Sequence, residues 1–315
     1  MNPIIIAECC QNHNGDRDIL KKMIHEAAIN GADYVKIQSI QSKDLTNRSR
    51  FNLGEINDDG SIKTIKRPYK DEYERLKKLD LSIEDEIWFI DECISAGVSP
   101  LTTLFTKGSI EKAKDLGYDA VKIASYDCAS FSLLKNIRKH WKKIFVSTGA
   151  TFDHEIKECS EILSGNDLYF LHCITIYPTP LEKLNMRRLS FLRKFTSKVG
   201  FSDHTKVKDT NLLASKIALA MGADVIERHF TILGESETKD GPVSINPSQL
   251  KELKNFANLT RYERMEQINL EYPNWPETLG SAKRDLTQEE MLNRDYYRGR
   301  FASKVDGVPV YNWEQ

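Results

Sequence analysis

The chain has 315 residues, of which 40% are hydrophobic and 29% are charged, the proportions of an ordinary folded protein. Its 45 Lys and Arg residues nearly balance its 46 Asp and Glu residues, so the net charge is −1. That balance argues against a protein that binds nucleic acid through a basic face. The sequence has no apolar run of the ~20 residues that a membrane span needs, and its N-terminal apolar run is too short for a signal peptide. We therefore expect a cytoplasmic protein that binds neither nucleic acid nor membranes.

Six cysteines are scattered along the chain, with neither a C-x-x-C pair nor the spacing of a zinc ribbon. The two adjacent cysteines cannot comfortably form a disulfide with each other. In a reducing compartment a free cysteine behaves as a small apolar side chain. We therefore expect most of these thiols to be buried; they belong to Cys9, Cys10, Cys93, Cys128, Cys159 and Cys173.

The most informative feature is an alternation between short runs rich in Val, Ile and Phe and stretches with helical periodicity. The helical stretches include 18–30, closed by Gly31; 82–96, capped by Ser82 and ended by Gly97; and a last helix over 247–267. The eight apolar runs, which predict strands, cover residues 3–9, 32–39, 98–105, 119–125, 143–149, 167–174, 198–204 and 224–230.

Eight strands that alternate with eight helices predict an α/β protein with a parallel sheet. A doubly wound open sheet is one way to arrange them. Closing the sheet as a (β/α)₈ TIM barrel removes both of its edges, and eight near-regular units over about 250 residues fit that fold better. We therefore predict a (β/α)₈ barrel domain over residues 1–268.

Two segments interrupt the alternation. Residues 40–81 are far longer than the ~2–6 residues of an ordinary βα loop. These residues are polar, and 69–78 could form a short helix. A long excursion at this face of a barrel is a candidate lid. Residues 269–315 form a short tail that we expect to be irregular, because it contains Pro273, Pro276 and Gly280 and is too short for a core of its own.

Polar residues gather near the ends of the predicted strands, where barrel enzymes place their chemistry. A barrel interior is normally filled by Val, Ile and Leu, so packing alone does not explain this concentration. The residues are Glu8, Lys36, Gln38, Thr102, Thr103, Lys122, Ser125, Ser147, Thr148, Gly149, His172, Asp203, His204, Glu227, Arg228 and His229.

Lys36 and Lys122 alternate with apolar neighbours, so both side chains could point into the barrel. One interpretation is that the two lysines extend toward the rim. The other is that they hold an anionic ligand, with phosphate the best candidate, because an unpaired desolvated ammonium is costly. Ser147, Thr148 and Gly149 favour the second interpretation, since they supply hydroxyls and backbone N–H groups just before a helix N-terminus.

Three histidines lie near the ends of successive predicted strands. A single histidine there, such as His172, is more often a hydrogen-bonded core residue than a ligand. His204 and His229, on neighbouring strands, could share a divalent metal with open positions, which suits the polarisation of a carbonyl. Candidate helpers on adjoining strand ends are Glu8, Asp203 and Glu227.

These strand-end strings resemble the sialic acid synthase (N-acetylneuraminate synthase) family, whose members condense phosphoenolpyruvate with an N-acyl-hexosamine. The ordered set is far more specific than any single string, and it extends over about residues 3–250. The matching strings are IAE at 6–8, NHNG at 12–15, VKIQ at 35–38, KIAS at 122–125, STG at 147–149, LHC at 171–173, YPTP at 177–180, SDHT at 202–205 and ERHF at 227–230.

The resemblance implies a transferase with a (β/α)₈ fold that uses a divalent metal, Mn²⁺ or Mg²⁺, and that could form a homodimer. It implies that His204 and His229 are the metal ligands and that Glu8 and Tyr177 face the sugar. It also implies that phosphoenolpyruvate is bound by Lys36, Thr103, Lys122, Ser125, Ser147 and Gly149. Gln38 and Thr148, in two of the matching strings, are further candidate substrate-binding residues.

The implied reaction begins when C3 of phosphoenolpyruvate attacks the metal-polarised aldehyde of the open-chain sugar. Water then adds at C2, and the tetrahedral intermediate expels phosphate. The product is a nine-carbon 2-keto-3-deoxy sugar acid, that is, a sialic-acid-like nonulosonic acid. An N-acetylmannosamine-like sugar is the implied acceptor.

Three features depart from the family's pattern. Asp127 stands where the family often has a glutamate that is proposed to activate water, and its side chain is one methylene shorter. Asp240, the candidate counterpart of the family's acidic residue and a candidate substrate-binding residue, precedes Gly241-Pro242, whereas the family usually has that residue after Gly-Pro. Typical members also carry a C-terminal antifreeze-like domain that supplies an arginine to the sugar's N-acyl group, and we expect no such domain in a chain that ends at Gln315.

Without that domain, the resemblance gives weaker support to N-acetylmannosamine as the particular acceptor. We hypothesise that residues 294–300 of the tail fold back over a barrel mouth, its own or a partner's, so that Arg298 or Arg300 replaces the lost arginine. The competing interpretation is a solvated basic tail or a packing strap on the barrel wall.

Two further functions remain open from the residues. The first is condensation of phosphoenolpyruvate with another aldose, such as a phosphorylated pentose or tetrose. Extra basic residues for the second phosphate would favour it, and the sequence does not place Arg187, Arg188 or Arg228 well enough to decide, whereas the YPTP string at 177–180 favours the sialic-type acceptor. The second is a barrel that binds sugar or phosphoenolpyruvate without turnover. Retention of both histidines, both lysines and Ser147 argues against a pure binding protein.

Overall fold

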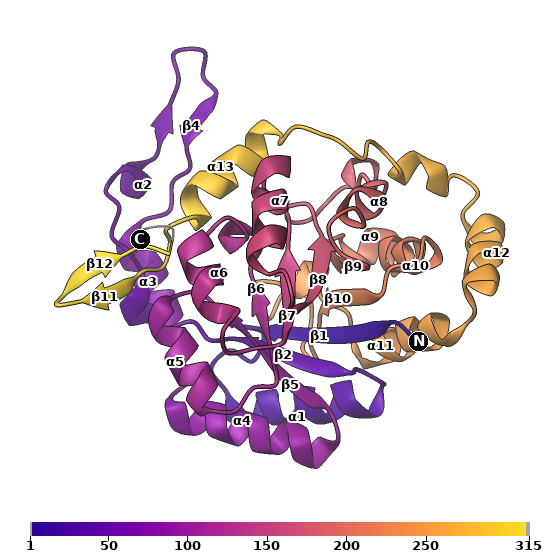
Figure 1. Cartoon of the computed structure of the whole chain (residues 1–315), viewed down its shortest axis with the longest axis horizontal. Helices are drawn as coiled ribbons and strands as arrows, with labels where there is room; N and C mark the ends of the chain where they lie inside the picture. Colours follow the sequence, from indigo (N-terminus) through magenta and orange to yellow (C-terminus); the bar gives the residue numbers. More distant parts are fainter. Residues whose placement is uncertain (1, 313–315) are drawn as a thin grey trace.

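The structure is a computed structural model that describes residues 2–312 of the chain. Within this range eight parallel strands close into a barrel in the order β1-β10-β9-β8-β7-β6-β5-β2, so the (β/α)₈ prediction is confirmed and the open sheet is excluded (Figure 1). Each strand overlaps its predicted run. The strands are β1 (Ile4–Cys10), β2 (Tyr34–Gln38), β5 (Ser99–Leu104), β6 (Ala120–Ile123), β7 (Lys143–Ser147), β8 (Asp167–His172), β9 (Lys198–Asp203) and β10 (Val225–His229).

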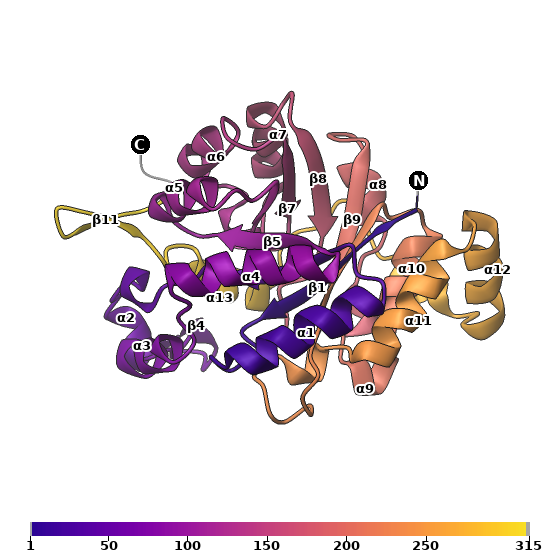
Figure 2. The ribbon, with the colours of Figure 1, turned by 90° about the horizontal axis from the view of Figure 1, so that it is seen from below.

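Helices cover the outside of the barrel, as Figures 1 and 2 show from two directions. Ser82 and Asp85 form the capping box of α4, and Gly97 ends that helix at φ 77°, so both signals are used as predicted. No helix among residues 2–312 is long and apolar enough to cross a membrane. The covering helices are α1 (Arg17–Ile29), α4 (Ile83–Ala96), α5 (Lys107–Asp115), α6 (Phe131–Ile137), α7 (Asp153–Ile162), α8 (Arg188–Leu192), α10 (Leu213–Ala220) and α11 (Pro247–Asn258).

The predicted helix over 247–267 is wrong in one respect, because the chain breaks it in two. Helix α11 ends at Asn258, and α12 (Arg261–Glu271) begins after Thr260. The Thr260 hydroxyl accepts the Glu263 N–H, and the Glu263 carboxylate accepts the Thr260 N–H. This capping box starts a new helix, which packs against α10 beside the barrel (Figure 2).

Side-chain alternation decides what faces the barrel interior. An apolar layer fills the interior, and it consists of Ile6, Tyr34, Leu101, Ala120, Phe145, Tyr169, Leu171 and Val225. Two residues further along a strand, a side chain returns to the same face, nearer the C-terminal mouth. The residues that follow six of these apolar positions by two are Glu8, Lys36, Thr103, Lys122, Ser147 and Glu227.

The segment after β2 is structured. It holds a hairpin of β3 (Glu55–Ile56) and β4 (Ile62–Thr64), which projects beyond the rest of the molecule in Figure 1. The short helix expected over 69–78 is present as α3 (Tyr69–Lys77). Two further turns of helix complete the segment, η1 (Ser42–Asp44) and α2 (Arg50–Leu53).

The tail is more regular than expected. It contains η5 (Trp275–Thr278), helix α13 (Gln288–Tyr297) and a hairpin of β11 (Ser303–Val305) and β12 (Val308–Val310). Thr287 and Glu290 form a capping box that starts α13, and Arg284 clamps the Glu290 carboxylate with two hydrogen bonds of 2.6 Å. The last three residues of the predicted tail, 313–315, lie outside the described residues.

The tail and the long segment after β2 hold each other. The guanidinium of Arg48 donates to the backbone carbonyls of Asp295, Tyr296 and Arg298 at 3.3, 2.5 and 3.2 Å. The Phe51 ring packs edge-on against Tyr296, with ring centres 5.1 Å apart. The two long excursions of the fold therefore form one surface layer.

Asp203 and Arg228 face away from the barrel mouth. They form an ion pair in which both side chains have no exposed surface, and Asp203 also accepts the Ser215 hydroxyl of α10 at 2.6 Å. Arg228 donates to the Thr205 carbonyl at 2.8 Å. Asp203 is thus not a helper for a metal at the mouth, because the alternation turns it toward the helix layer.

We predict that Asp203→Ala lowers the free energy of unfolding by about 3–5 kcal/mol, because it leaves the Arg228 guanidinium buried and unpaired. Asp209, which forms an exposed pair with Lys206 at 3.5 Å, gives the control Asp209→Ala, with an expected loss below about 1 kcal/mol. Urea denaturation measures both. Equal losses for the two variants would contradict the assignment of a structural role to the buried pair.

Candidate active site

Four charged side chains meet inside the mouth of the barrel. Lys36 Nζ donates to the Glu8 carboxylate, and Lys122 Nζ donates to Glu227 Oε1 at 3.1 Å. Glu227 also lies beside the other lysine, with Oε2 3.6 Å from Lys36 Nζ. All four residues are at most 5% exposed. Because both lysines are buried in the interior, the interpretation that they extend to the rim is wrong.

Hydroxyl groups complete the surroundings of these lysines. Thr103 Oγ1 accepts from Lys36 Nζ at 2.9 Å, and Ser147 Oγ accepts from Lys122 Nζ at 2.8 Å. Ser202 donates its hydroxyl to Glu227 Oε1 at 2.8 Å. The sequence places these residues on different strands, and the barrel brings them together.

The charges of the cluster perturb one another. Burial raises the pKa of Glu227, but the ammonium groups of Lys122 and Lys36 outweigh it and hold that pKa well below its usual range. Burial lowers the pKa of Lys36, but Glu227 and Glu8 overcome this and raise it. At Lys122 burial prevails over Glu227, so the pKa is lowered. Lys122 is therefore the less completely neutralised of the two cations.

The turn after β7 lies against the end of β8. A Cβ on Gly149 would stand 2.6 Å from Cys173 Sγ and 2.7 Å from Thr175 Cγ2, so only glycine permits this approach. Ser125 Oγ lies 3.0 Å from Cys173 Sγ. Thr148 differs from the prediction for this string, because its hydroxyl donates to the Leu171 carbonyl in the barrel wall at 3.2 Å.

A pair of imidazoles lies beside the charged cluster. The ring centres of His204 and His229 are 5.4 Å apart, and the ring of Tyr177 lies 4.3 Å from that of His204. Both histidines are buried, and neither Nδ1 has a hydrogen-bond partner within residues 2–312. Burial, followed by the charge of His229, lowers the pKa of His204 well below its usual value, which favours the neutral imidazole. Neutral imidazole is the form that binds metals.

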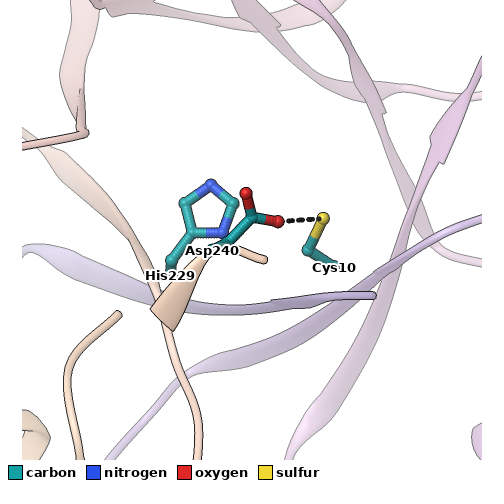
Figure 3. A group of neighbouring side chains, drawn as sticks. All are labelled: Cys10, His229 and Asp240. Carbon is teal, nitrogen blue, oxygen red and sulfur yellow. Dashed lines mark hydrogen bonds between the residues drawn. The ribbon is translucent and has the colours of Figure 1, made fainter. Parts of the chain in front are cut away.

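One member of this pair, His229, lies close to two further side chains. Figure 3 shows His229 together with Cys10 and Asp240. One potential ligand atom from each lies within 4.8 Å of those of the other two, and the Cys10 thiol donates to Asp240 Oδ2 at 3.3 Å. Together with the unpartnered buried Nδ1 atoms, this donor set fits a divalent metal. His204 does not belong to the 4.8 Å group, although it lies on the neighbouring strand.

Cys10 was not predicted as a site residue. Strand β1 contains a bulge between Glu8 and Cys10, and Glu8 Oε1 accepts the Cys10 N–H at 2.7 Å. Cys10 has φ 47°, a left-handed conformation that costs a residue with a side chain about 1 kcal/mol or more. The alternation that places Glu8 on the inner face is the signal that could have found it, since Cys10 follows by two.

The remaining predicted residues lie in different surroundings. Asp127, in η2 (Ser125–Asp127), accepts hydrogen bonds from Ser130 Oγ at 2.8 Å and from Asn312 Nδ2 at 2.9 Å. Gln38 is partly buried and pairs in register with Thr103. His172 is a core residue, as the commoner interpretation has it, and its Nε2 lies 2.6 Å from the Leu184 carbonyl.

The tail lies over the mouth of its own barrel. The ring of Tyr297 stacks on Tyr126, which follows β6, with centres 4.8 Å apart. Asn293 donates to the Thr175 carbonyl after β8 at 2.8 Å, and Arg294 donates to the Ala150 carbonyl after β7 at 2.5 Å. These contacts agree with the own-mouth form of the tail hypothesis.

Within this tail the two candidate arginines are placed differently. Arg300 forms an ion pair with Glu72 of α3 and so ties the tail to the long segment after β2. Arg298 lies 3.4 Å from Glu155, at the start of α7, and is one of the charges that act on Asp127.

Residues 23–266 match the NeuB family. This chain belongs to the NeuB family. N,N'-diacetyllegionaminic acid synthase of Campylobacter jejuni is 33% identical over 264 residues, which cover 79% of this chain and 74% of that protein. Pseudaminic acid synthase of the same species is 30% identical over 304 residues, 95% of this chain and 81% of that protein. The crystal structure of the Bacillus subtilis spore coat polysaccharide biosynthesis protein SpsE has a TM-score of 0.72 at 26% identity, covering 94% and 77% of the two chains.

Asp127 provides a test of the electrostatics in this NeuB-family mouth. Burial raises its pKa from the ordinary 3.8 to about 6, in spite of the hydrogen bonds from Asn312 and Ser130. Between these two pH values the folded protein keeps a proton that the unfolded chain has lost, so stability falls as the pH rises through this window and then levels off. The shift corresponds to roughly 3 kcal/mol.

We predict that Asp127→Asn removes this pH dependence. The free energy of unfolding of the variant, relative to wild type, should increase by roughly 3 kcal/mol from pH about 3 to pH about 7. Urea titrations across this range measure it, with the exposed Asp58→Asn as the control. A difference that does not change with pH would contradict the burial of an ionisable Asp127.

Proposed function

We propose that the protein condenses phosphoenolpyruvate with an N-acylated hexosamine of the N-acetylmannosamine type, giving a sialic-acid-like nonulosonic acid and phosphate. The observation that carries the proposal is the meeting of two buried lysines and two buried imidazoles at one barrel mouth. The relatives named as legionaminic and pseudaminic acid synthases support it. The protein is accordingly a transferase that forms a carbon–carbon bond.

Lys122 and Ser147 are the proposed centre of the phosphoenolpyruvate site. Their Nζ and Oγ atoms lie 2.8 Å apart, so one phosphate or carboxylate oxygen can receive hydrogen bonds from both. Lys36 with Thr103 offers a second pair of donors. The remaining proposed contacts are Gln38, Ser125 and Gly149, whereas the hydroxyl and the N–H of Thr148 both donate to the Leu171 carbonyl in the barrel wall.

His204 and His229 are the proposed holders of a divalent metal, with Asp240 close to His229. When bound there, a metal supplies Lewis-acid polarisation of the sugar aldehyde. The ring of Tyr177 lies tilted against that of His204, and Tyr177 is 48% exposed, which allows it to contact the sugar from the solvent side. Glu8, which lies between Cys10 and Lys36, is the proposed contact on the inner side.

The water that adds at C2 must lose a proton to a group of the protein. A bond forms between C3 of phosphoenolpyruvate and the aldehyde carbon, and the bond from C2 to the phosphate oxygen later breaks. Asp127 is the proposed acceptor of the water proton, because a carboxyl with a pKa of about 6 is ionised at neutral pH and holds a proton better than an ordinary aspartate.

The environment of three arginines disfavours a phosphorylated pentose or tetrose as acceptor. Arg228 is paired with Asp203 behind the barrel wall. Arg187 donates a hydrogen bond to the Gly280 carbonyl at 2.8 Å, and Arg188 donates one to the Asp153 carboxylate at 2.5 Å. These side chains are engaged in the fold, so they are poorly placed to bind a second phosphate.

Phosphate release from phosphoenolpyruvate in the presence of Mn²⁺ tests the proposal. We expect release with N-acetylmannosamine or a 2,4-diacetamido-trideoxyhexose, and none with arabinose 5-phosphate, erythrose 4-phosphate or no acceptor. A chelator should abolish it, and Lys122→Ala should lower the rate about 100-fold or more. The buried Lys216, paired with Glu252 on the helix layer at 2.7 Å, gives the control Lys216→Ala.

Failure to bind phosphoenolpyruvate would refute the family-based function. Binding without release from any acceptor would favour the binding-protein alternative instead. Phosphate release that occurs only with a phosphorylated aldose would refute the N-acyl-hexosamine as acceptor but support the condensation reaction.

For the acceptor, we propose that Arg298 contacts the N-acyl group from the tail. Arg300 is tied to Glu72, whereas Arg298 lies near Asp127 and has a 29% exposed side chain. Arg298→Ala should raise the KM for the acceptor sugar about tenfold, the loss of one charge-assisted hydrogen bond, and leave the KM for phosphoenolpyruvate unchanged. Initial-rate kinetics with each substrate varied in turn, and Arg300→Ala as the control, measure it. Unchanged acceptor kinetics in both variants would exclude the tail from sugar binding.

A further inference from the structure

We propose that the Cys10 thiolate is a direct ligand of the divalent metal, together with His229 and Asp240, and that this sulfur makes the protein select Zn²⁺, Fe²⁺ or Co²⁺ over Mg²⁺. The inference rests on the proposed function and deepens it, because it changes the donor set from two imidazoles to a mixture of sulfur, nitrogen and oxygen. Soft thiolate ligands favour these metals, whereas Mg²⁺ prefers oxygen.

The first support is the spacing of the donor atoms. Cys10 Sγ and Asp240 Oδ2 are 3.3 Å apart, and all three residues offer a ligand atom within 4.8 Å of the others (Figure 3). Two ligands on one tetrahedral zinc, with bonds of about 2.3 Å to sulfur and about 2.1 Å to oxygen, lie about 3.5 Å apart. The metal can therefore take the place of the proton that the thiol and carboxylate now share.

The second support is independent of that spacing. His229 is only 8% exposed, and its Nδ1 has no hydrogen-bond partner within residues 2–312. His204, on the neighbouring strand, has the same unsatisfied Nδ1 and is 6% exposed. A buried polar atom without a partner is costly, and a metal would satisfy it. His204 lies outside the group of three donors, so it would have to move toward them to become a fourth protein ligand.

The backbone supports the choice of Cys10 over its neighbour. The bulge in β1 and the left-handed φ of 47° bring the Cys10 thiol to the Asp240 carboxylate. Cys9, one residue earlier, is buried in the apolar layer between the barrel and the helices, near Cys93. Two adjacent thiols of the same chain thus lie on opposite sides of one strand, which provides a matched control.

A thiol that only donates a hydrogen bond to Asp240 is the competing explanation. The two differ in one measurable way, because a metal-bound cysteine has lost its proton and forms a metal–sulfur bond. Such a bond to Co²⁺ produces a charge-transfer absorption band in the near ultraviolet, which nitrogen and oxygen ligands do not produce.

The test uses the full chain, stripped of metal by a chelator and reloaded with Co²⁺. We expect the charge-transfer band in the wild type and in Cys9→Ala, and its loss in Cys10→Ser. The affinity for Zn²⁺, measured by competition with a chromophoric chelator, should fall about tenfold or more in Cys10→Ser, while that for Mg²⁺ changes far less. X-ray absorption of the zinc-loaded wild type should contain a sulfur shell at about 2.3 Å, a readout that does not depend on any variant folding.

The outcomes separate this inference from the proposed function. A Co²⁺-loaded wild type without the band, a zinc shell of nitrogen and oxygen alone, or a band that persists in Cys10→Ser would each overturn the inference. Failure of the wild type to bind Co²⁺ would overturn it as well. Phosphate release is measured on the same preparations, so an active enzyme without a metal–sulfur bond refutes only the thiolate ligand, and a metal–sulfur bond without activity refutes only the proposed function.

Discussion

The mouth of this barrel depends on a set of charges that cannot be separated without a large penalty. Lys36, Lys122, Glu8 and Glu227 are withdrawn from water, and each is compensated by a neighbour on another strand. Removal of one partner from a buried ion pair leaves an uncompensated charge, which costs more than the pair itself contributes. The cluster links β1, β2, β6 and β10, so the same electrostatics that would recognise an anion also fix the positions of these strands at the mouth.

A second layer of ion pairs closes over that mouth from one side. Arg294 and Arg298 of the tail form ion pairs with Glu155. Asn312 donates a hydrogen bond to the Asp127 carboxylate. Tail residues thereby contact η2, which follows β6, and the first turn of α7, which follows β7, in the same chain. The position of Asp127 is determined as much by the far end of the sequence as by its own strand, which is why its surroundings, and not only its side-chain length, set its proton affinity.

The barrel and the inward-facing residues could be predicted because both follow from a period of two along each strand. The same rule, applied strictly, would have turned Asp203 and Arg228 toward the helices. The helix starts after Thr260 and Thr287 could also have been predicted, because each is marked in the sequence by a Thr followed three residues later by a Glu, the pattern of a capping box. The alternation also places Cys10 on the inner face, two residues after Glu8, but its contact with Asp240, 230 positions further along the chain, could not be read from the sequence.

The two lysines differ in a way that the sequence alone could not indicate. Lys36 is held by Glu8 and also lies near Glu227, whereas Lys122 relies on Glu227, which both cations share. An ammonium group has three donors, and those of Lys122 serve one hydroxyl and one shared carboxylate oxygen among residues 2–312. An incoming anion gains more by completing the neutralisation of Lys122 than by competing with Glu8 for Lys36. The asymmetry therefore supports Lys122 as the centre of the proposed phosphate site, with Lys36 holding Glu8.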